Sequence, residues 1–199
     1  GEYMPVYENE RGTYIFNSKD LCMIEHIPEL MDAGIDSFKI EGRMKTALYV
    51  ATVARTYRKA IDDYKKDPAL YRKNMEWYKE EIGKCTYREF TTGFYFGKPT
   101  TDSQIYDSNT YVKNYTYLGT VEEVREDGCC RIEQKNKFSV GEQIEIMKPD
   151  GRNVLVTVKG ITDEDGNAME SAPHPKQILW VDLGSEVSPY DILRRSEME

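Results

Sequence analysis

Two short polar clusters hold the side chains of this sequence that are best suited to chemistry. The first, Asn17-Ser-Lys-Asp-Leu-Cys22, ends in a cysteine, and the second, Lys39-Ile-Glu-Gly-Arg-Met-Lys45, places three cations and a carboxylate within seven residues. Each cluster follows a stretch typical of a short strand and precedes one typical of a helix. Because such junctions of an α/β fold converge on one edge of the sheet, we expect both clusters to form part of one ligand site.

The second cluster offers Lys39, Arg43 and Lys45 beside Glu41. These cations suit a phosphate or a dicarboxylate, because a guanidinium donates two parallel hydrogen bonds to such a group. Glu41 is a candidate to orient Lys39. The alternative is that these charges are only solvated beside a helix start, as surface charges commonly are. The residues alone leave both interpretations open.

Cys22 is expected in the first turn of a helix, with Ser18 or Asp20 capping the first backbone amides. The aligned amides of a helix start favour the thiolate, which is the form that attacks electrophiles or binds a metal. The plainer interpretation is a small buried apolar residue, the usual role of a free cysteine. Asp20 is similarly ambiguous, because it either belongs to the ligand site or serves only as a cap.

The remaining residues do not nominate a self-contained catalytic site. His26 and His174 are far apart, and neither an H-E-x-x-H nor a G-x-S-x-G motif is present. A hydrolase would need a nucleophile with its base, or a set of metal ligands, and we find neither. The aromatic run Phe94-Tyr-Phe96 could stack nucleobases, but alternating aromatic residues in a β-rich segment are more often core residues.

Patterning predicts the elements that position these clusters. A strand over residues 12–17, a helix that ends at Gly34 and a strand over 35–40 would form a βαβ unit with a parallel pair of strands. A long helix is predicted over 46–66, with Arg55 among its surface residues. Its expected buried face holds Val50, Val53, Ala54, Tyr57, Ile61 and Tyr64.

A further helix is predicted over residues 71–82, closed by Gly83. After Cys85 the sequence changes to short β-rich runs, so a domain boundary is expected between residues 85 and 110. The predicted strands cover residues 115–124, 129–134, 143–147, 153–160 and 177–183. A small closed barrel is the economical arrangement, because closure removes exposed strand edges. We therefore expect an α+β fold, with βα units over residues 1–85 and a β-barrel domain over 86–199.

Composition limits the function classes. The chain has 199 residues, of which 39% are hydrophobic, and its net charge of -8 excludes a globally basic nucleic-acid binder. The excess of acidic side chains is unevenly distributed along the chain. Residues 1–85 hold 14 basic and 15 acidic side chains, while residues 86–199 hold 13 basic and 20 acidic ones. No apolar run is long enough to cross a membrane, and no signal peptide is evident. The four cysteines lack paired metal spacing, so we expect a cytoplasmic protein without disulfides.

The two clusters and several later motifs together resemble the collagenase-like protease family, peptidase family U32. The later motifs are Thr92-Gly-Phe-Tyr-Phe-Gly97, Pro173-His-Pro-Lys-Gln177 and Tyr190-Asp-Ile-Leu-Arg194. The resemblance implies that this chain, which starts at Gly1, is the C-terminal part of a longer protein. Residues 1–67 would then be the last βα units of a TIM-like barrel, which would hold most of the active site.

The same resemblance implies a function and a cofactor. Better understood members of the family resemble RNA-modifying enzymes that hydroxylate a pyrimidine in tRNA or rRNA, some with the dicarboxylate prephenate as a co-substrate. Asp20, Lys39, Glu41, Arg43 and Lys45 would then belong to the substrate site. Cys22 matches the last of a cysteine set that resembles iron-sulfur ligation. A cluster is expected only in the longer protein, because a single thiolate cannot replace about four ligands.

Three functions therefore stay open. The first is an RNA base hydroxylase, the second a peptidase as the family name says, and the third a module that binds RNA or protein without catalysis. We expect the longer protein to be an enzyme and this chain alone to lack both catalysis and a cofactor. We also expect the βα segment to expose apolar surface, through which the chain could associate with itself.

Overall fold

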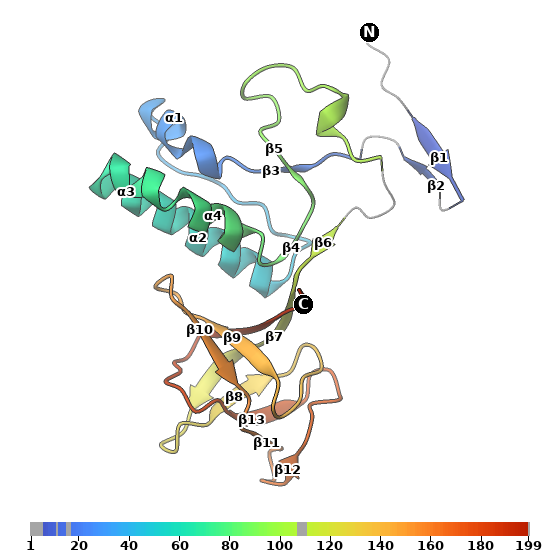
Figure 1. Ribbon diagram of the computed structural model, residues 1–199, viewed down its shortest axis with the longest axis vertical. Coiled ribbons are helices and arrows are strands. Elements are labelled where there is room, and N and C mark those ends of the chain that lie inside the picture. Colours follow the sequence, from blue (N-terminus) through green and yellow to red (C-terminus); the bar gives the residue numbers. More distant parts are fainter. Residues whose placement is uncertain (1–5, 11, 15–16, 107–110, 199) are drawn as a thin grey trace.

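The structure is a computed structural model that describes residues 6–10, 12–14, 17–106 and 111–198. It combines helices and strands in two parts, with a group of helices packed beside an antiparallel sheet (Figure 1). No helix in these ranges is both long and apolar enough to cross a lipid bilayer.

The helical part is built around one long helix. The described residues form the 3-10 helix η1 (Ile24–His26) and the α-helices α1 (Ile27–Asp32), α2 (Ala47–Lys66), α3 (Pro68–Lys73) and α4 (Met75–Ile82). The hydroxyl of Thr46 caps α2 by accepting a hydrogen bond from the Tyr49 N–H at 3.2 Å. Asp67 ends α2 and caps α3 by accepting from the Ala69 N–H at 2.8 Å. The helix predicted over 46–66 is confirmed, whereas the helix predicted over 71–82 is divided between α3 and α4.

The buried face of α2 differs from the prediction. Val53 is buried as expected, but Val50 is 43% exposed and Ala54 is exposed as well. Arg55, which we expected on the surface, is only 9% exposed. The difference arises because α2 packs against the sheet as well as against α1 and α4. A charged side chain can be buried there when it is paired.

The predicted βαβ unit is wrong. Gly34 adopts the expected left-handed conformation (φ +77°) after α1, but residues 35–40 form no strand. A strand requires a neighbour for its backbone hydrogen bonds, and this segment has none within the described chain. The parallel pair instead joins β3 (Asp20–Leu21) to β5 (Phe90–Thr91).

Two further strand pairs lie outside the eight-stranded sheet described below. Strand β1 (Tyr7–Asn9) pairs with β2 (Gly12–Tyr14) in an antiparallel hairpin. This β2 covers only the start of the strand predicted over residues 12–17, and Ile15 and Phe16 lie outside the described residues. Strand β4 (Thr86–Tyr87) pairs with β6 (Val112–Lys113), which leads the chain into the sheet.

The C-terminal part is one eight-stranded antiparallel sheet with the order β10-β9-β14-β7-β8-β13-β11-β12. Its strands are β7 (Tyr115–Val124), β8 (Cys130–Glu133), β9 (Gln143–Met147), β10 (Asn153–Thr157), β11 (Gly160–Thr162), β12 (Ala168–Met169), β13 (Ile178–Asp182) and β14 (Ile192–Ser196). The sheet curls into half a barrel, and the end strands β10 and β12 do not pair with each other (Figure 1). The closed barrel that we expected is therefore not completed by the described strands.

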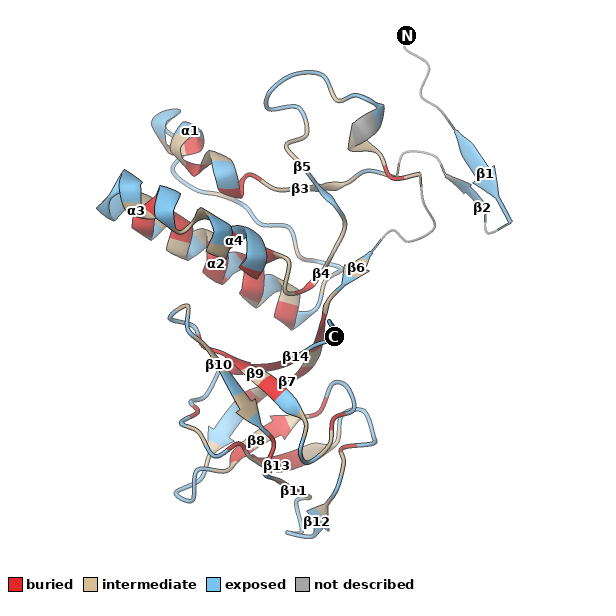
Figure 2. Ribbon diagram, in the orientation of Figure 1, coloured by how far each residue is buried: buried red, intermediate tan, exposed pale blue. Residues whose placement is uncertain are grey.

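Two hydrophobic cores meet at the boundary between the helices and the sheet. The sheet core gathers inward side chains such as Leu118, Ile132 and Leu193. The helical core contains Met147 of β9 and Ile192 of β14 along with the helix residues. Because neighbouring residues of a strand point to opposite faces, β14 contributes Leu193 to one core and Ile192 to the other. Figure 2 accordingly colours residues of both α2 and β14 as buried.

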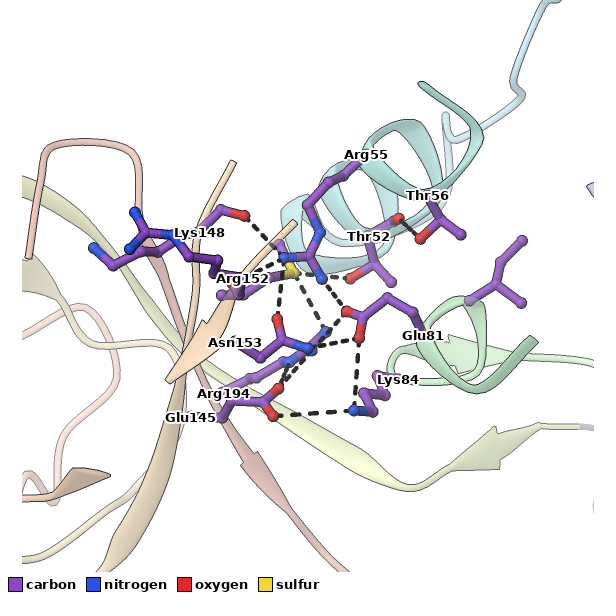
Figure 3. Close-up of polar contacts among 12 residues, drawn as sticks. Thr52, Arg55, Thr56, Glu81, Lys84, Glu145, Lys148, Arg152, Asn153 and Arg194 are labelled. Atoms are coloured by element: carbon purple, nitrogen blue, oxygen red, sulfur yellow. Dashed lines mark hydrogen bonds and ion pairs between the residues drawn. The ribbon is translucent and has the colours of Figure 1, made fainter. Parts of the chain in front are cut away.

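A network of buried ion pairs spans the boundary between the helices and the sheet (Figure 3). Glu81 of α4, which is 1% exposed, lies between Arg55 of α2 and Arg194 of β14. Its Oε1 atom accepts from Arg194 Nη2 at 2.6 Å and from Arg55 Nη2, while Oε2 accepts from Asn153 Nδ2 at 2.8 Å. Arg194 Nε also donates to Glu145 Oε1 at 2.7 Å. The network joins two helices to β9, β10 and β14, so it fixes how the two parts sit against each other.

Candidate anion-binding site

A cavity of about 740 Å³ lies on the helical part, between the loop that follows α1 and the strand β3. Its volume falls in the range typical of small-molecule sites. The charged side chains that line it are Asp20, Lys39, Glu41, Arg43, Lys45 and Arg88. The structure thus brings five of the six predicted site residues to one cavity, and it adds Arg88. Cys22 is not part of the lining.

Asp20 is held by two cations at the edge of this cavity. Its carboxylate accepts from Lys45 Nζ at 3.3 Å, from Arg88 Nε at 3.0 Å and from the backbone N–H of Arg88 at 3.0 Å. Asp20 lies in strand β3 and caps no helix, so the predicted cap is wrong. The three bonds instead tie β3 to the start of α2 and to the chain beside β5.

The ionisation of Asp20 follows from these contacts. Burial by itself raises the pKa of its carboxyl group. The Arg88 N–H and the positive charges of Lys45 and Arg88 together lower the pKa by more than burial raises it, so the net pKa lies below the usual value of 3.8. Asp20 is therefore ionised at neutral pH, and its charge is compensated within the protein.

The cavity retains uncompensated positive charge. Within the described residues no carboxylate forms an ion pair with Lys39 or Arg43. Glu41 Oε1 accepts from the backbone N–H of Arg43 at 2.8 Å, which shapes the loop. Glu41 was predicted to orient Lys39, but in the structure it accepts from Arg43 instead. Because Lys45 and Arg88 share Asp20, the two remaining cations leave the cavity with a net positive charge.

Aromatic rings complete the wall of the cavity. Lys45 Nζ lies 4.8 Å from the ring centroid of Tyr49 and 5.2 Å from that of Tyr111, and the Arg88 guanidinium lies 5.9 Å from Tyr111. Contacts of a cation with a ring face are attractive, so these rings hold the cations over the cavity. Arg88, Tyr49 and Tyr111 were not predicted as site residues, and Arg88 and Tyr111 reach the cavity only through the tertiary fold.

Cys22 lies behind the cavity, in the connection between β3 and η1. It is two residues ahead of a three-residue helix, so the predicted place in a helical first turn is wrong. The Tyr57 hydroxyl accepts from the Met23 N–H at 2.7 Å and donates to Cys22 Sγ at 3.7 Å. Since Tyr57 lines the cavity, it connects the thiol to the cavity wall.

The environment of Cys22 favours the protonated thiol. Burial raises the pKa of Cys22 above the usual value of 9.0, and the hydrogen bond from Tyr57 offsets only part of that effect. Within the described residues no group of three or more His, Cys, Asp or Glu side chains is arranged to hold a metal ion. Cys22 is therefore a partly buried, protonated thiol in this structure.

The remaining candidates occupy different environments. Phe94-Tyr-Phe96, expected mainly as core, are 80%, 56% and 61% exposed, so that interpretation is wrong. His26 contacts Glu29 through Nδ1 at 3.2 Å, and its ring packs on Phe96. Cys130 is fully buried in the sheet core, whereas Cys129 is partly exposed.

Comparison with known protein families places the chain. The profile of peptidase family U32 matches residues 2–105, and that of the peptidase family U32 C-terminal domain matches residues 113–194. The chain belongs to peptidase family U32. This confirms the resemblance found in the sequence. The first match contains the helices and the cavity lining apart from Tyr111, and the second contains the eight-stranded sheet up to residue 194.

Individual relatives of this U32 chain carry two kinds of name. It is 37% identical to tRNA hydroxylation protein P1 of Bacillus subtilis over 96% of this chain and 46% of that protein. It is 35% identical to tRNA hydroxylation protein P of Escherichia coli over 98% of this chain and 43% of that protein. A collagenase of Porphyromonas gingivalis is 29% identical over 92% of this chain and 50% of its own length. The chain therefore spans about half the length of the curated relatives it matches.

Among solved structures, the C-terminal domain of a U32 peptidase from Geobacillus thermoleovorans is 30% identical to this chain, with a TM-score of 0.38. The alignment covers 40% of this chain and 99% of the solved domain.

Proposed function

We propose that this chain is the C-terminal part of an RNA-modifying enzyme that hydroxylates a pyrimidine in tRNA or rRNA. The observation that carries the proposal is the similarity, along nearly the whole chain, to two proteins named for tRNA hydroxylation. Because those proteins are about twice as long, the reaction and its substrate are proposed for a full-length protein. The family name describes a different reaction, and the names of the two relatives support hydroxylation over it.

The cavity is the proposed anion site of this enzyme. Lys39 and Arg43 have no carboxylate partner in the part of the chain that the structure describes, and Arg43 can donate two hydrogen bonds to one planar group. A phosphate of the RNA backbone and a small dicarboxylate co-substrate such as prephenate share the chemistry that these cations recognise. Asp20 would keep Lys45 and Arg88 in place while the two free cations bind the anion.

The cofactor and the larger fold are further parts of the proposal. Cys22 would give one ligand to an iron-sulfur cluster, with the other ligands outside this chain, and no reaction step is derived through it. Residues 1–85 would complete a TIM-like barrel, in which the parallel pair β3–β5 would find further strands. Residues 86–199 would be the accessory β-domain. A cytoplasmic location would give the enzyme access to its RNA.

The test uses a full-length protein in a strain that lacks its own copy. Hydroxylated pyrimidine in digested tRNA and rRNA is measured by mass spectrometry after complementation with the wild type or with Lys39→Ala, Arg43→Ala or Cys22→Ala. We expect the wild type to restore the nucleoside and the variants to reduce it. Arg152→Ala is the control, because this exposed arginine lies in the turn between β9 and β10, where its side chain pairs with Asp150. An unchanged nucleoside after gene deletion would refute the proposal.

A collagenase-like peptidase is the second candidate, and the similarity to the Porphyromonas gingivalis collagenase favours it. The structure nominates no nucleophile for this reaction. Cys22 contacts Tyr57, and His26 contacts Glu29. Gelatin cleavage by a full-length protein, lost on one substitution along the cavity, would support the peptidase. A binding module without catalysis would show RNA binding and neither activity.

A further inference from the structure

The turn between β5 and Pro99 presents three aromatic side chains to solvent. Phe94 is 80% exposed, Tyr95 56% and Phe96 61%. In Figure 2 most of the loop beyond β5 is coloured as exposed, although the ring of Phe96 also packs on that of His26 in η1. Large aromatic side chains usually bury most of their surface, and a group of exposed ones commonly marks a binding site.

The conformation of the turn is stabilised by hydrogen bonds within it. Gly93 (φ +58°) and Gly97 (φ +142°) adopt backbone conformations that residues with a side chain rarely adopt. The Tyr95 N–H donates to the Thr92 carbonyl at 3.3 Å, and the Gly93 N–H donates to Thr91 Oγ1 at 3.2 Å. These bonds mean that the aromatic side chains are presented from a formed turn, which lowers the conformational entropy lost on binding.

One ring of the turn is shared between two cavities. Tyr95 and Leu21 line both the cavity of about 740 Å³ and a neighbouring cavity of about 510 Å³. Phe94 lines only the second one. Both volumes fall within the range of small-molecule sites, so two flat groups can bind side by side with Tyr95 and Leu21 between them.

Cationic side chains line both cavities next to the aromatic rings. Lys39 and Arg43 line the first cavity without carboxylate partners. Lys19 lines the second, where its Nζ lies 2.9 Å from Glu89 Oε2. Flat aromatic surfaces beside cations suit a ligand that has both π faces and negative charge. An acidic peptide offers the charge without the π faces, whereas a single-stranded nucleic acid offers both.

We propose that the turn 93–97 is a stacking platform for unpaired bases of RNA, with adjacent bases in the two cavities and the connecting phosphate near Lys39 and Arg43. The choice of RNA rests on the function proposed above, and the platform adds that the substrate is single-stranded at the point of binding. In a duplex the faces of the bases are already stacked, so a duplex cannot use Phe94 and Tyr95.

The test measures binding of a short labelled oligouridine to the whole chain by fluorescence anisotropy. The same strand in a duplex, and polyphosphate as competitor, distinguish base stacking from charge alone. We expect the single strand to bind best, and Phe94→Ala and Tyr95→Ala each to weaken it by roughly tenfold. Tyr95→Phe keeps the ring and should bind like the wild type.

Two controls separate stacking from other effects. Tyr190→Ala removes an equally exposed ring (80%) from the sheet part and should leave binding unchanged. Arg43→Ala should lower the slope of log affinity against log salt by roughly 0.7 if it contacts one phosphate. That change in slope is not expected from Phe94→Ala, since a ring releases no counterions.

Several outcomes would overturn the platform. They are equal binding of duplex and polyphosphate, absence of binding, and binding that the ring substitutions leave unchanged. If the turn is covered by a second copy, sedimentation would show a dimer that Phe94→Ala dissociates. If another part of a longer protein covers it, Phe94→Ala would destabilise that protein without changing RNA binding. The hydroxylation assay is separate, so RNA hydroxylation could be confirmed while the platform is refuted.

Discussion

Glu81 and Arg194 form a buried ion pair across the boundary between the helices and the sheet. Glu81 Oε1 lies 2.6 Å from Arg194 Nη2, and the two residues are 1% and 0% exposed. Arg55 pairs with the same carboxylate from α2. One carboxylate therefore pairs with cations from two parts of the chain. Its removal would leave both arginines buried without the negative charge of Glu81.

The first prediction concerns the stability of this joint. Glu81→Gln keeps the shape of the side chain but removes its charge, so we expect a loss of about 3 kcal/mol in the free energy of unfolding. Urea denaturation measures it. The matched control is Glu80→Gln, because Glu80 is an exposed carboxylate that pairs with Lys84 at 2.9 Å and should contribute less than about 1 kcal/mol. Equal effects of the two substitutions would show that the buried network does not stabilise the boundary.

The second prediction is the pH dependence of the same pair. Burial raises the pKa of Glu81, but Arg194 and Arg55 lower it more strongly, so the net pKa lies below the usual value of 4.5. A carboxyl group with a lowered folded-state pKa stabilises the fold above its unfolded-state pKa, and this stabilisation is lost as the pH falls through the folded-state value.

The stability difference between wild type and Glu81→Gln should therefore shrink as the pH falls from about 5 to about 3. Urea midpoints of both proteins along that series measure the difference, and other carboxylates cancel because both proteins contain them. A difference that stays constant over this window would mean that the pKa of Glu81 is the same in the folded and the unfolded protein.

Local patterns predicted the regular elements of this fold. The helix over 46–66 and the strands over 115–124 and 143–147 agree with α2, β7 and β9, because their apolar periodicity depends on neighbouring residues only. The expected strand over residues 35–40 failed because a strand also requires a partner, which sequence spacing does not reveal. Local signals thus located elements without predicting which strands pair.

Buried charges could not be predicted in the same way. Arg55 was expected on the surface because arginine is seldom buried without a partner. Its partners are Glu81, 26 positions later, and the Lys148 carbonyl, 93 positions later. The cavity shows the same limit: the cluster from Lys39 to Lys45 was visible in the sequence, whereas Arg88 meets Asp20 across 68 positions. Ligand binding at the cavity stays a prediction.

The third prediction concerns charge in the cavity. Asp20→Asn removes the carboxylate that compensates Lys45 and Arg88, while the amide oxygen can still accept the Arg88 N–H. The cavity becomes more positive, so we expect malonate, a simple dicarboxylate, to bind about fivefold more tightly at low salt. Isothermal titration calorimetry measures this affinity, and high salt should reduce the gain.

The control for this charge effect is Asp62→Asn. Asp62 is an exposed carboxylate that pairs with Arg58 on α2, outside the cavity lining. It changes the net charge of the chain by the same amount and should leave malonate affinity nearly unchanged. Weaker binding in Asp20→Asn would mean that the position of Lys45 and Arg88 matters more than the charge of Asp20.

The fourth prediction concerns the thiol behind the cavity. The Tyr57 hydroxyl donates to Cys22 Sγ at 3.7 Å, and this bond stabilises the thiolate against the burial that raises the pKa of Cys22. Tyr57→Phe removes the donor, so the pKa of Cys22 should rise further and alkylation by iodoacetamide at about pH 8.5 should slow. Mass spectrometry of the Cys22 peptide over time measures the rate.

Cys85 and Cys130 provide an internal control for that rate, because both are fully buried and burial raises the pKa of each thiol to about 12. Their peptides should stay unmodified unless the chain unfolds. Tyr64→Phe, a change elsewhere on α2, should leave the Cys22 rate unchanged. Faster alkylation of Cys22 in Tyr57→Phe, with Cys85 and Cys130 still protected, would show that Tyr57 limits access to the thiol more than it stabilises the thiolate.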